Sequence, residues 1–231
     1  MKLGVIIAAG GIGGRMGLGS SKQLMLLAGE PVLARSAAIF EVAAVEEIVI
    51  VIDSADVERC RNVVDKFGFR KVSGVFAGGE NRSQSVWNGM QKLGPNTDTV
   101  LIHDGARPLF PPELLAAGLR DFGMGDCDGV VFGLPVTDTI KEAGINNRLV
   151  AGTLDRSRLW AAQTPQIFRR AVLEKAYRVP PLTLAAASDD ASLVERAGGL
   201  VKMTMGSPEN IKITTPADLV VAEEILRRRG K

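Results

Sequence analysis

A glycine-rich segment followed by two cations is the part of the sequence best suited to chemistry. Residues 8–17 read AAGGIGGRMG, and the basic side chains Arg15 and Lys22 stand seven positions apart. Glycines let the backbone approach a ligand closely, and successive N–H groups can hold phosphate oxygens. The segment therefore predicts a phosphate-binding loop, although an exposed turn with solvated charges explains these residues equally well when they are taken alone.

The spacing of this segment excludes two common nucleotide-binding loops. A dinucleotide fingerprint GxGxxG that begins at Gly11 would need a glycine where Met16 stands. A P-loop needs a lysine followed by serine or threonine, and no lysine of the chain has such a neighbour. The sequence thus disfavours a nicotinamide oxidoreductase and a P-loop nucleotidase.

The composition bounds the partners and the location of the protein. The 231 residues include 28 basic and 26 acidic side chains, which are scattered along the chain and predict neither a nucleic acid nor a membrane partner. No stretch approaches the ~20 apolar residues that span a bilayer. One histidine, His103, and two distant cysteines, Cys60 and Cys127, cannot form a zinc cluster. We expect a cytoplasmic protein with two buried, reduced thiols.

Apolar segments of two periods alternate along the chain. Runs of strand type, apolar throughout, occupy residues 3–9, 47–52, 72–77, 99–103, 129–134 and 200–204. Segments with helical period lie between them at 31–44, 54–67, 82–93 and 112–122. This alternation predicts a Rossmann-like α/β fold, in which a mostly parallel sheet is flanked by helices. The glycine segment directly follows the first strand, where such folds bind nucleotides.

Two segments depart from this alternation in ways that predict their structure. Residues 135–153 are polar and contain the turn sequence GINN at 144–147, so we expect a protruding β-hairpin arm outside the main sheet. Near the end of the chain, Thr215, Pro216 and Asp218 predict the capped start of a last helix. We predict a single domain over residues 1–231, with a dimerisation arm at about 135–153.

The glycine segment, together with the pair Lys22-Gln23, resembles the signature of nucleoside-diphosphate-sugar pyrophosphorylase-like nucleotidyltransferases. Six further motifs follow in colinear order: GGENRSQSV at 78–86, HDGARP at 103–108, DT at 138–139, DR at 155–156, TPQ at 164–166 and NIKIT at 210–214. Together they resemble the 2-C-methyl-D-erythritol 4-phosphate cytidylyltransferases over nearly the whole chain. The loop is one residue longer than the shortest family form, AAGxGxRM, and Ser21 stands where the family usually has proline.

The resemblance implies transfer of CMP from CTP to 2-C-methyl-D-erythritol 4-phosphate, a small polyol phosphate. It places Arg15 and Lys22 at the α-phosphate, and Arg156 and Lys212 at the acceptor phosphate. It also implies a homodimer in which Arg156 of each arm serves the partner's site. The residues expected to contact CTP are Ala8, Ala9, Gly10, Gly11, Gly13, Gly78, Gly79, Ser85, Asp104 and Ala106. Those expected to contact the acceptor are Asp104, Arg107, Thr139, Arg156, Thr164 and Lys212.

The chemistry of this reaction needs cations more than a base. A phosphate monoester has a second pKa of about 6 and is already a nucleophile at neutral pH. Mg²⁺, or another divalent cation, would be bound mainly through the CTP phosphates, so the chain need not supply a metal cage. We leave the protein ligand of the metal unassigned. Asp104 stands near the metal or the ribose, or else caps the following turn, and His103 is interpreted as structural.

Three other functions remain open on the sequence. A ribitol 5-phosphate cytidylyltransferase shares the loop and several motifs, but the sequence DRSRLW at 155–160 favours the erythritol enzymes. A sugar 1-phosphate nucleotidyltransferase is disfavoured, because such chains are commonly longer and lack the arm motifs. A non-catalytic CTP-binding regulatory protein is hard to reconcile with the retention of Arg15, Lys22, Arg156 and Lys212.

Overall fold

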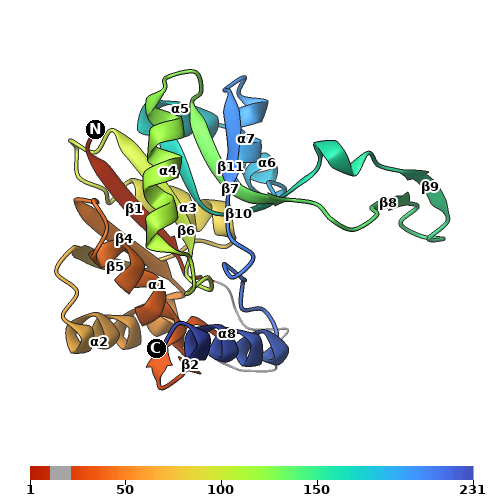
Figure 1. Ribbon diagram of the computed structural model, residues 1–231. Helices are drawn as coiled ribbons and strands as arrows, with labels where there is room; N and C mark the ends of the chain where they lie inside the picture. Colours follow the sequence, from red (N-terminus) through yellow and green to blue (C-terminus); the bar gives the residue numbers. More distant parts are fainter. Residues whose placement is uncertain (11–21, 231) are drawn as a thin grey trace.

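The computed structural model describes residues 1–10 and 22–230, and a seven-stranded sheet runs through its centre (Figure 1). The strand order is β11-β7-β10-β6-β1-β4-β5. The strands are β1 (Leu3–Ala8), β4 (Glu47–Ile52), β5 (Val72–Ala77), β6 (Thr99–Asp104), β7 (Gly129–Pro135), β10 (Trp160–Arg169) and β11 (Val201–Met205). All neighbours pair in parallel except β10, which is antiparallel to both β6 and β7. The predicted α/β fold with a mostly parallel sheet is confirmed.

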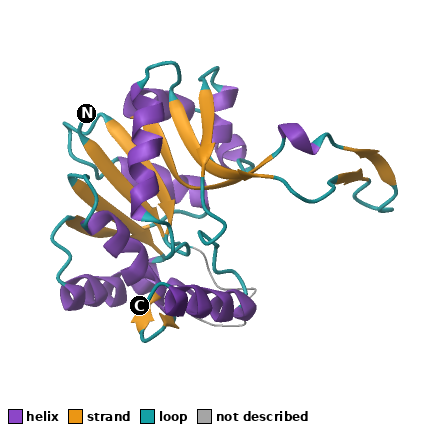
Figure 2. Ribbon diagram, viewed as in Figure 1, coloured by secondary structure: helices purple, strands orange, loops and turns teal. Residues whose placement is uncertain are grey.

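Helices cover both faces of this sheet, because its central strands are apolar on both sides (Figure 2). Within β1, Val5 and Ile7 pack on one face and Ile6 on the other. The first face is covered by α1 (Val32–Glu41), α2 (Val57–Phe67) and α4 (Pro112–Gly123). The second is covered by α3 (Arg82–Met90), α5 (Arg170–Ala176), α6 (Pro181–Ala185) and α7 (Asp190–Arg196). Each predicted strand and helix is present, with ends displaced by a few residues.

The last helix, α8 (Pro216–Arg228), lies below the sheet and closes a smaller apolar cluster. The Thr215 side chain accepts from the backbone N–H of Asp218, whose carboxylate accepts from the N–H of Thr215 in return. This reciprocal cap satisfies two of the N–H groups that a helix start leaves unpaired. The predicted start of α8 is therefore confirmed. Two short pieces, β2 (Leu26–Leu27) and β3 (Glu30–Pro31), form a ribbon against it.

The sequence analysis did not predict strand β10, although its ten residues lie between β6 and β7. Its middle reads Gln163-Thr164-Pro165-Gln166, and both proline and a run of polar side chains argue against a central strand. The chain accommodates them because the register with β7 is irregular between Ala162 and Gln166. The polar side chains of this stretch therefore lie near the end of β6 and not in the apolar core.

Residues 136–159 leave the body between β7 and β10 and form the protruding arm (Figure 1). Its tip is a two-stranded ribbon of β8 (Lys141–Ala143) and β9 (Val150–Thr153), separate from the main sheet. Every residue from 141 to 151 is exposed, and the apolar side chains of Ile145 (97%) and Leu149 (69%) are among them. The expected hairpin arm is present. The assignment of residues 1–231 to a single domain stays a prediction.

His103, the only histidine of the chain, is wholly buried in β6. Its Nε2–H donates to the carbonyl of Arg107 (2.9 Å), and the Thr164 hydroxyl donates to Nδ1 (3.2 Å). The ring lies edge-on to Phe40 and Phe110. Burial lowers the pKa of His103 to about 4, so the ring is neutral and fully paired at neutral pH. The structure supports its interpretation as a structural residue.

Cys60 and Cys127 are both buried free thiols. Burial raises the pKa of Cys60 to about 12, so it stays protonated. Within the described residues, no helix is long and apolar enough to cross a membrane.

The close contact between α4 and β7 gives a first testable prediction. A Cβ on Gly118 would lie 2.4 Å from the ring of Phe132, which is buried and already packed against Phe110. We expect Gly118→Ala to destabilise the protein by about 1–3 kcal/mol in urea unfolding, because overpacking outweighs the gain in helix propensity. Gly123→Ala, at the open end of the same helix, is the control and should not destabilise. Equal stability of both variants would contradict this packing.

The buried neutral His103 predicts a pH dependence of stability. Because its pKa is lower in the folded protein than in the unfolded chain, the unfolded chain binds the extra proton between about pH 6.5 and pH 4. Stability is thus complete above pH 6.5 and falls as the pH decreases, by on the order of 3 kcal/mol. In His103→Gln the slope of unfolding free energy against pH over this range should flatten. An unchanged slope would show that other groups cause it.

Candidate active site

The carboxyl ends of β1, β5 and β6 meet at one edge of the sheet and bring three predicted segments together. Ala8 and Asp104 are directly paired in the register of β1 and β6. The N–H of Gly78, just after β5, donates to the carbonyl of Ile52 at the end of β4 (2.7 Å). Residues 8–10, which begin the glycine segment, therefore lie at the same edge as the GGENRSQSV motif and the HDGARP motif, as the parallel fold predicts.

A pocket of about 250 Å³ opens at this edge, and we call it the first pocket. It is lined by Ala8, Gly10, Lys22, Gln23, Asn81, Arg82, Ser85, Asp104, Ala106 and Lys212. Seven of these were predicted as site residues from the sequence. The predicted Ala9 is buried behind the pocket, and its N–H donates to the carbonyl of Val51. The predicted residues Gly11, Gly13 and Arg15 lie outside the described part of the chain.

One wall of the first pocket is the start of α3, with Asn81, Arg82 and Ser85. The predicted Gly78 and Gly79 do not line this pocket, but they pack against the helix, Gly78 on Ser85 and Gly79 on Gln84. The Ser85 hydroxyl donates to the carbonyl of Asn81 and accepts from the N–H of Gly79, both at 2.9 Å. A Cβ on Gly78 would lie 2.6 Å from the Ser85 oxygen, so only glycine fits there. Asn81 caps the helix by accepting from the N–H of Gln84. Ser85 thus fixes the backbone that was predicted to bind cytosine, and its hydroxyl proton is already used.

Asp104, at the end of β6, is surrounded by three cations, and we call these four residues the Asp104 cluster. Arg82 Nε lies 3.1 Å from Oδ1, while Lys212 Nζ and Arg107 Nε lie 2.8 Å and 3.7 Å from Oδ2. Burial alone would raise the pKa of Asp104, but the cations outweigh it and hold that pKa well below its ordinary value. Asp104 is an ionised anchor for positive side chains and not the cap of the following turn.

A second pocket, of about 270 Å³, opens on the other side of this cluster. It is lined by Arg82, Asp104, Arg107, Ala162, Gln163, Thr164, Gln166, Ser188, Asp189 and Lys212. Three residues of the Asp104 cluster, namely Arg82, Asp104 and Lys212, line both pockets. Two cavities therefore share one ionic wall. Thr164, Arg107 and Lys212, predicted to contact the acceptor, all line the second pocket.

Strand β10 supplies four of the five uncharged residues of the second pocket, Ala162, Gln163, Thr164 and Gln166. The Thr164 hydroxyl accepts from the N–H of Asp104 (3.0 Å), which links β10 to the end of β6. Asn210 donates to the carbonyl of Thr164 (2.9 Å), and the carbonyl of Asn210 accepts from Arg107 Nη1 (2.7 Å). The segment that carries Lys212 is thereby tied to the sheet.

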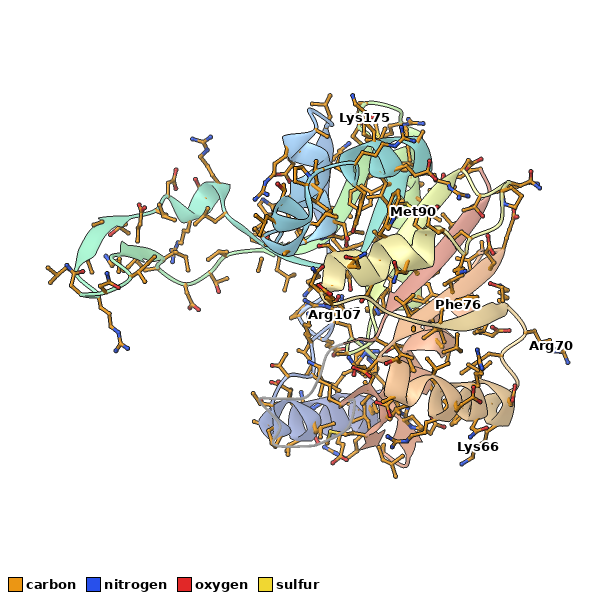
Figure 3. The ribbon with its side chains drawn as sticks, turned by 180° about the vertical axis from the view of Figure 1, so that it is seen from behind. Lys66, Arg70, Phe76, Met90, Arg107 and Lys175 are labelled. Atoms are coloured by element: carbon orange, nitrogen blue, oxygen red, sulfur yellow. The ribbon has the colours of Figure 1, made fainter. Side chains whose placement is uncertain are left out.

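The structure does not bring Arg156 and Thr139 to either pocket of the same chain. Both lie on the arm, where Thr139 is exposed and Arg156 Nη1 donates to the carbonyl of Thr137 (2.6 Å). Figure 3 shows the side chains of the arm projecting into the surroundings, away from Arg107 in the body. Arg156 and Thr139 could therefore contact the acceptor, as predicted, only in the pocket of a second molecule of the protein.

Several residues of the site were missed or undervalued in the sequence. Arg82 was not among the residues predicted to contact a substrate, yet it lines both pockets. Asn81 had a readable signal, since asparagine before a helical segment is a favoured cap. Asp190 and Tyr177, which stand behind Arg82, had none, because their contacts join parts of the chain that are distant in sequence.

The first pocket fits a metal ion that is held mainly by a ligand. Asp104 is its only carboxylate among the described residues, and both oxygens already face cations. Within the same residues, no three histidine, cysteine or carboxylate side chains form a metal-binding group. A metal here would therefore take most of its oxygens from phosphates and water.

Comparison with known proteins agrees with this geometry. A family model described as 2-C-methyl-D-erythritol 4-phosphate cytidylyltransferase matches residues 3–228. The cytidylyltransferase of that name from Geotalea uraniireducens is 42% identical, with 98% of this chain and 97% of the relative covered. Its counterpart from Alkaliphilus metalliredigens is 40% identical, with 99% and 94% covered.

Solved structures give the same result. The 2-C-methyl-D-erythritol 4-phosphate cytidylyltransferase of Francisella tularensis superposes with a TM-score of 0.82 at 28% identity, covering 97% of this chain and 99% of that one. A 4-diphosphocytidyl-2C-methyl-D-erythritol synthase from Anaerococcus prevotii gives 0.81 at 25% identity, covering 98% and 96%. On the match of sequence, fold and motif order, this chain belongs to the 2-C-methyl-D-erythritol 4-phosphate cytidylyltransferase family.

Proposed function

We propose that the first pocket binds CTP and the second binds the acceptor phosphate. The chain is a cytidylyltransferase that transfers CMP from CTP to 2-C-methyl-D-erythritol 4-phosphate, in the non-mevalonate route to isoprenoid precursors. The products are 4-diphosphocytidyl-2-C-methyl-D-erythritol and pyrophosphate. The observation that carries the placement of the substrates is the ionic wall that both pockets share.

The reaction joins two anions, so its main obstacle is charge. The acceptor is a phosphate monoester, which is largely dianionic at neutral pH and attacks the α-phosphate without a general base. The only histidine is neutral, buried and fully paired, which suits a reaction that needs no proton carrier there. Cations preorganised around the reacting phosphates then supply most of the stabilisation of the transition state.

Lys22 and Lys212 have distinct roles in this proposal. Lys22 lines only the first pocket, where it meets charge that develops at the α-phosphate, and Arg15 has the same role. Lys212 lines both pockets and reaches Asp104 at 2.8 Å, so it can hold the acceptor phosphate beside CTP. Asp104 keeps Lys212 extended toward the wall before any substrate arrives.

Thr164 and Arg107 complete the acceptor side, and the glycines after β5 complete the CTP side. The cytosine would be read by the backbone carbonyls of Gly78 and Gly79, because their N–H groups already donate to Ile52 and Ser85. Gly78 packs closely on Ser85 and Gly79 on Gln84, which excludes larger residues at both positions. Mg²⁺ would be held by the CTP phosphates near Asp104, where it would neutralise the charge of the leaving pyrophosphate.

The arm completes the proposal, because it carries Arg156 and Thr139 away from their own body. We propose a homodimer in which each arm reaches the second pocket of the partner. The exposed Ile145 and Leu149 support a partner surface, since a two-stranded ribbon is marginal on its own. A cytoplasmic location is part of the proposal and is supported by the two free thiols.

The division of roles predicts different kinetic defects. Lys22→Ala and Arg15→Ala should lower kcat by about 10²- to 10³-fold with little change in the KM for the acceptor, because they act on charge that develops in the transition state. Lys212→Ala should act mainly on the KM of the acceptor. Steady-state assays of pyrophosphate release measure both constants. A near-normal kcat in Lys22→Ala would show that this lysine does not act on the transition state.

The crossed arm predicts complementation between two inactive variants. Arg156→Ala and Lys22→Ala homodimers should each be defective, but a mixed dimer has one site with both residues intact. Random exchange of subunits should restore activity at about a quarter of the sites. A mixture of Lys22→Ala and Arg15→Ala is the control and should restore no activity, because both defects lie in the body and every site of a mixed dimer keeps one of them. If the subunits exchange and no activity returns, Arg156 acts within its own chain.

A further inference from the structure

A buried ion pair lies directly behind the ionic wall. The Asp190 side chain has no exposed surface, and its Oδ2 lies 2.8 Å from Arg82 Nη1. The Tyr177 hydroxyl donates to the other oxygen, Oδ1, at 2.5 Å. Burial opposes the charge of Arg82, but Asp190 and then Asp104 outweigh it, and the pKa of Arg82 is raised. Arg82 is therefore charged.

The cap of α7 does not use this charge. Asp190 is the first residue of α7, but the cap of that helix is Asp189, whose carboxylate accepts from the N–H of Ser192 (2.9 Å). A buried ion pair is often no more stabilising than apolar side chains of the same volume. The retention of Asp190 in the interior thus points to a requirement of the site.

That requirement is the placement of Arg82. Its Nε reaches Asp104 while its Nη1 reaches Asp190, so the planar guanidinium is held between an outer and an inner carboxylate. Asp104 cannot fix it alone, since it also engages Lys212 and Arg107. Asp190 has no other cationic partner among the described ion pairs, so its charge acts on Arg82 alone.

The residues around Asp190 are fixed by two contacts with the body. Gln166 of β10 donates to Asp189 (2.8 Å) and accepts from the N–H of Ala191 (3.2 Å), which holds the start of α7 on the sheet. The ring of Tyr177 stacks on Trp87, with centroids 5.8 Å apart, and Trp87 lies on the same helix as Arg82. Helices α3, α5 and α7 therefore meet at this carboxylate.

We propose that Asp190 and Tyr177 are positioning residues for cytidylyl transfer. Tyr177 orients the carboxylate of Asp190, and Asp190 holds Arg82 at the wall between the two pockets. Neither residue lines a pocket, so neither touches a substrate. The proposal rests on the assignment of CTP to the first pocket.

A double-mutant cycle separates positioning from a structural role. Tyr177→Phe removes one hydroxyl and keeps the ring on Trp87, and it should lower kcat/KM for CTP by about tenfold. In an Arg82→Gln background the same change should add less than about twofold, because the group that it positions is gone. Asp190→Asn should lower kcat/KM for CTP more than Tyr177→Phe does. In the Arg82→Gln background it should likewise add less than about twofold. If turnover of Arg82→Gln is too slow to measure, calorimetric titration with CTP and Mg²⁺ gives the affinity of each variant, and the same comparison is made on the Kd for CTP.

The control is Ser192→Ala, which removes a hydroxyl from α7, the helix of Asp190, at a position without a described contact to Arg82. It should leave kcat/KM unchanged, and melting temperatures of all variants report general loss of packing. A tenfold loss on Tyr177→Phe in both backgrounds would overturn the proposal, as would full activity of Tyr177→Phe and Asp190→Asn. Failure of the wild-type protein to bind CTP would instead contradict the assignment of the first pocket.

Discussion

The attraction between one carboxylate and three cations organises the catalytic edge of this protein. Asp104 ends a fully buried strand and holds Arg82, Arg107 and Lys212, which come from three separate parts of the chain. Without that negative charge, the three cations would repel one another in a poorly solvated space. Every other contact of the site either supports this arrangement or borders one of the two pockets beside it.

The antiparallel strand explains how such a site fits on a mostly parallel sheet. Because β10 runs opposite to β6, its first half extends past the end of β6 and continues from the arm. Thr164 can therefore bond the backbone of Asp104, while Gln166 further along fixes α7. One strand thus connects the arm, the second pocket and the buried carboxylate behind Arg82.

Much of this could be predicted from the sequence, for identifiable reasons. Parallel strands that are buried on both faces are apolar throughout, so the sequence predicted them. The start of α8 was predicted because its capping residues are neighbours in the sequence. Asp104 and Lys212 were found because their motifs are contiguous. Strand β10 was not predicted, since its polar centre and Pro165 oppose strand formation and only the irregular register accommodates them. Asp190 was not predicted either, because a buried carboxylate can be recognised only from its partners, and folding brings these together from distant parts of the sequence.

The shared wall also constrains how enzymes of this architecture could diverge. A change at Arg82, Asp104 or Lys212 alters both pockets at once, so one substrate cannot be exchanged there without disturbing the other. Ala162, Gln163 and Ser188 line only the second pocket. Gln163 also bonds Ser207 and Asn210, close in sequence to Lys212, so a change there would disturb the ionic wall as well. Ala162 and Ser188 are therefore the positions through which the acceptor could change while the nucleotide pocket stays the same.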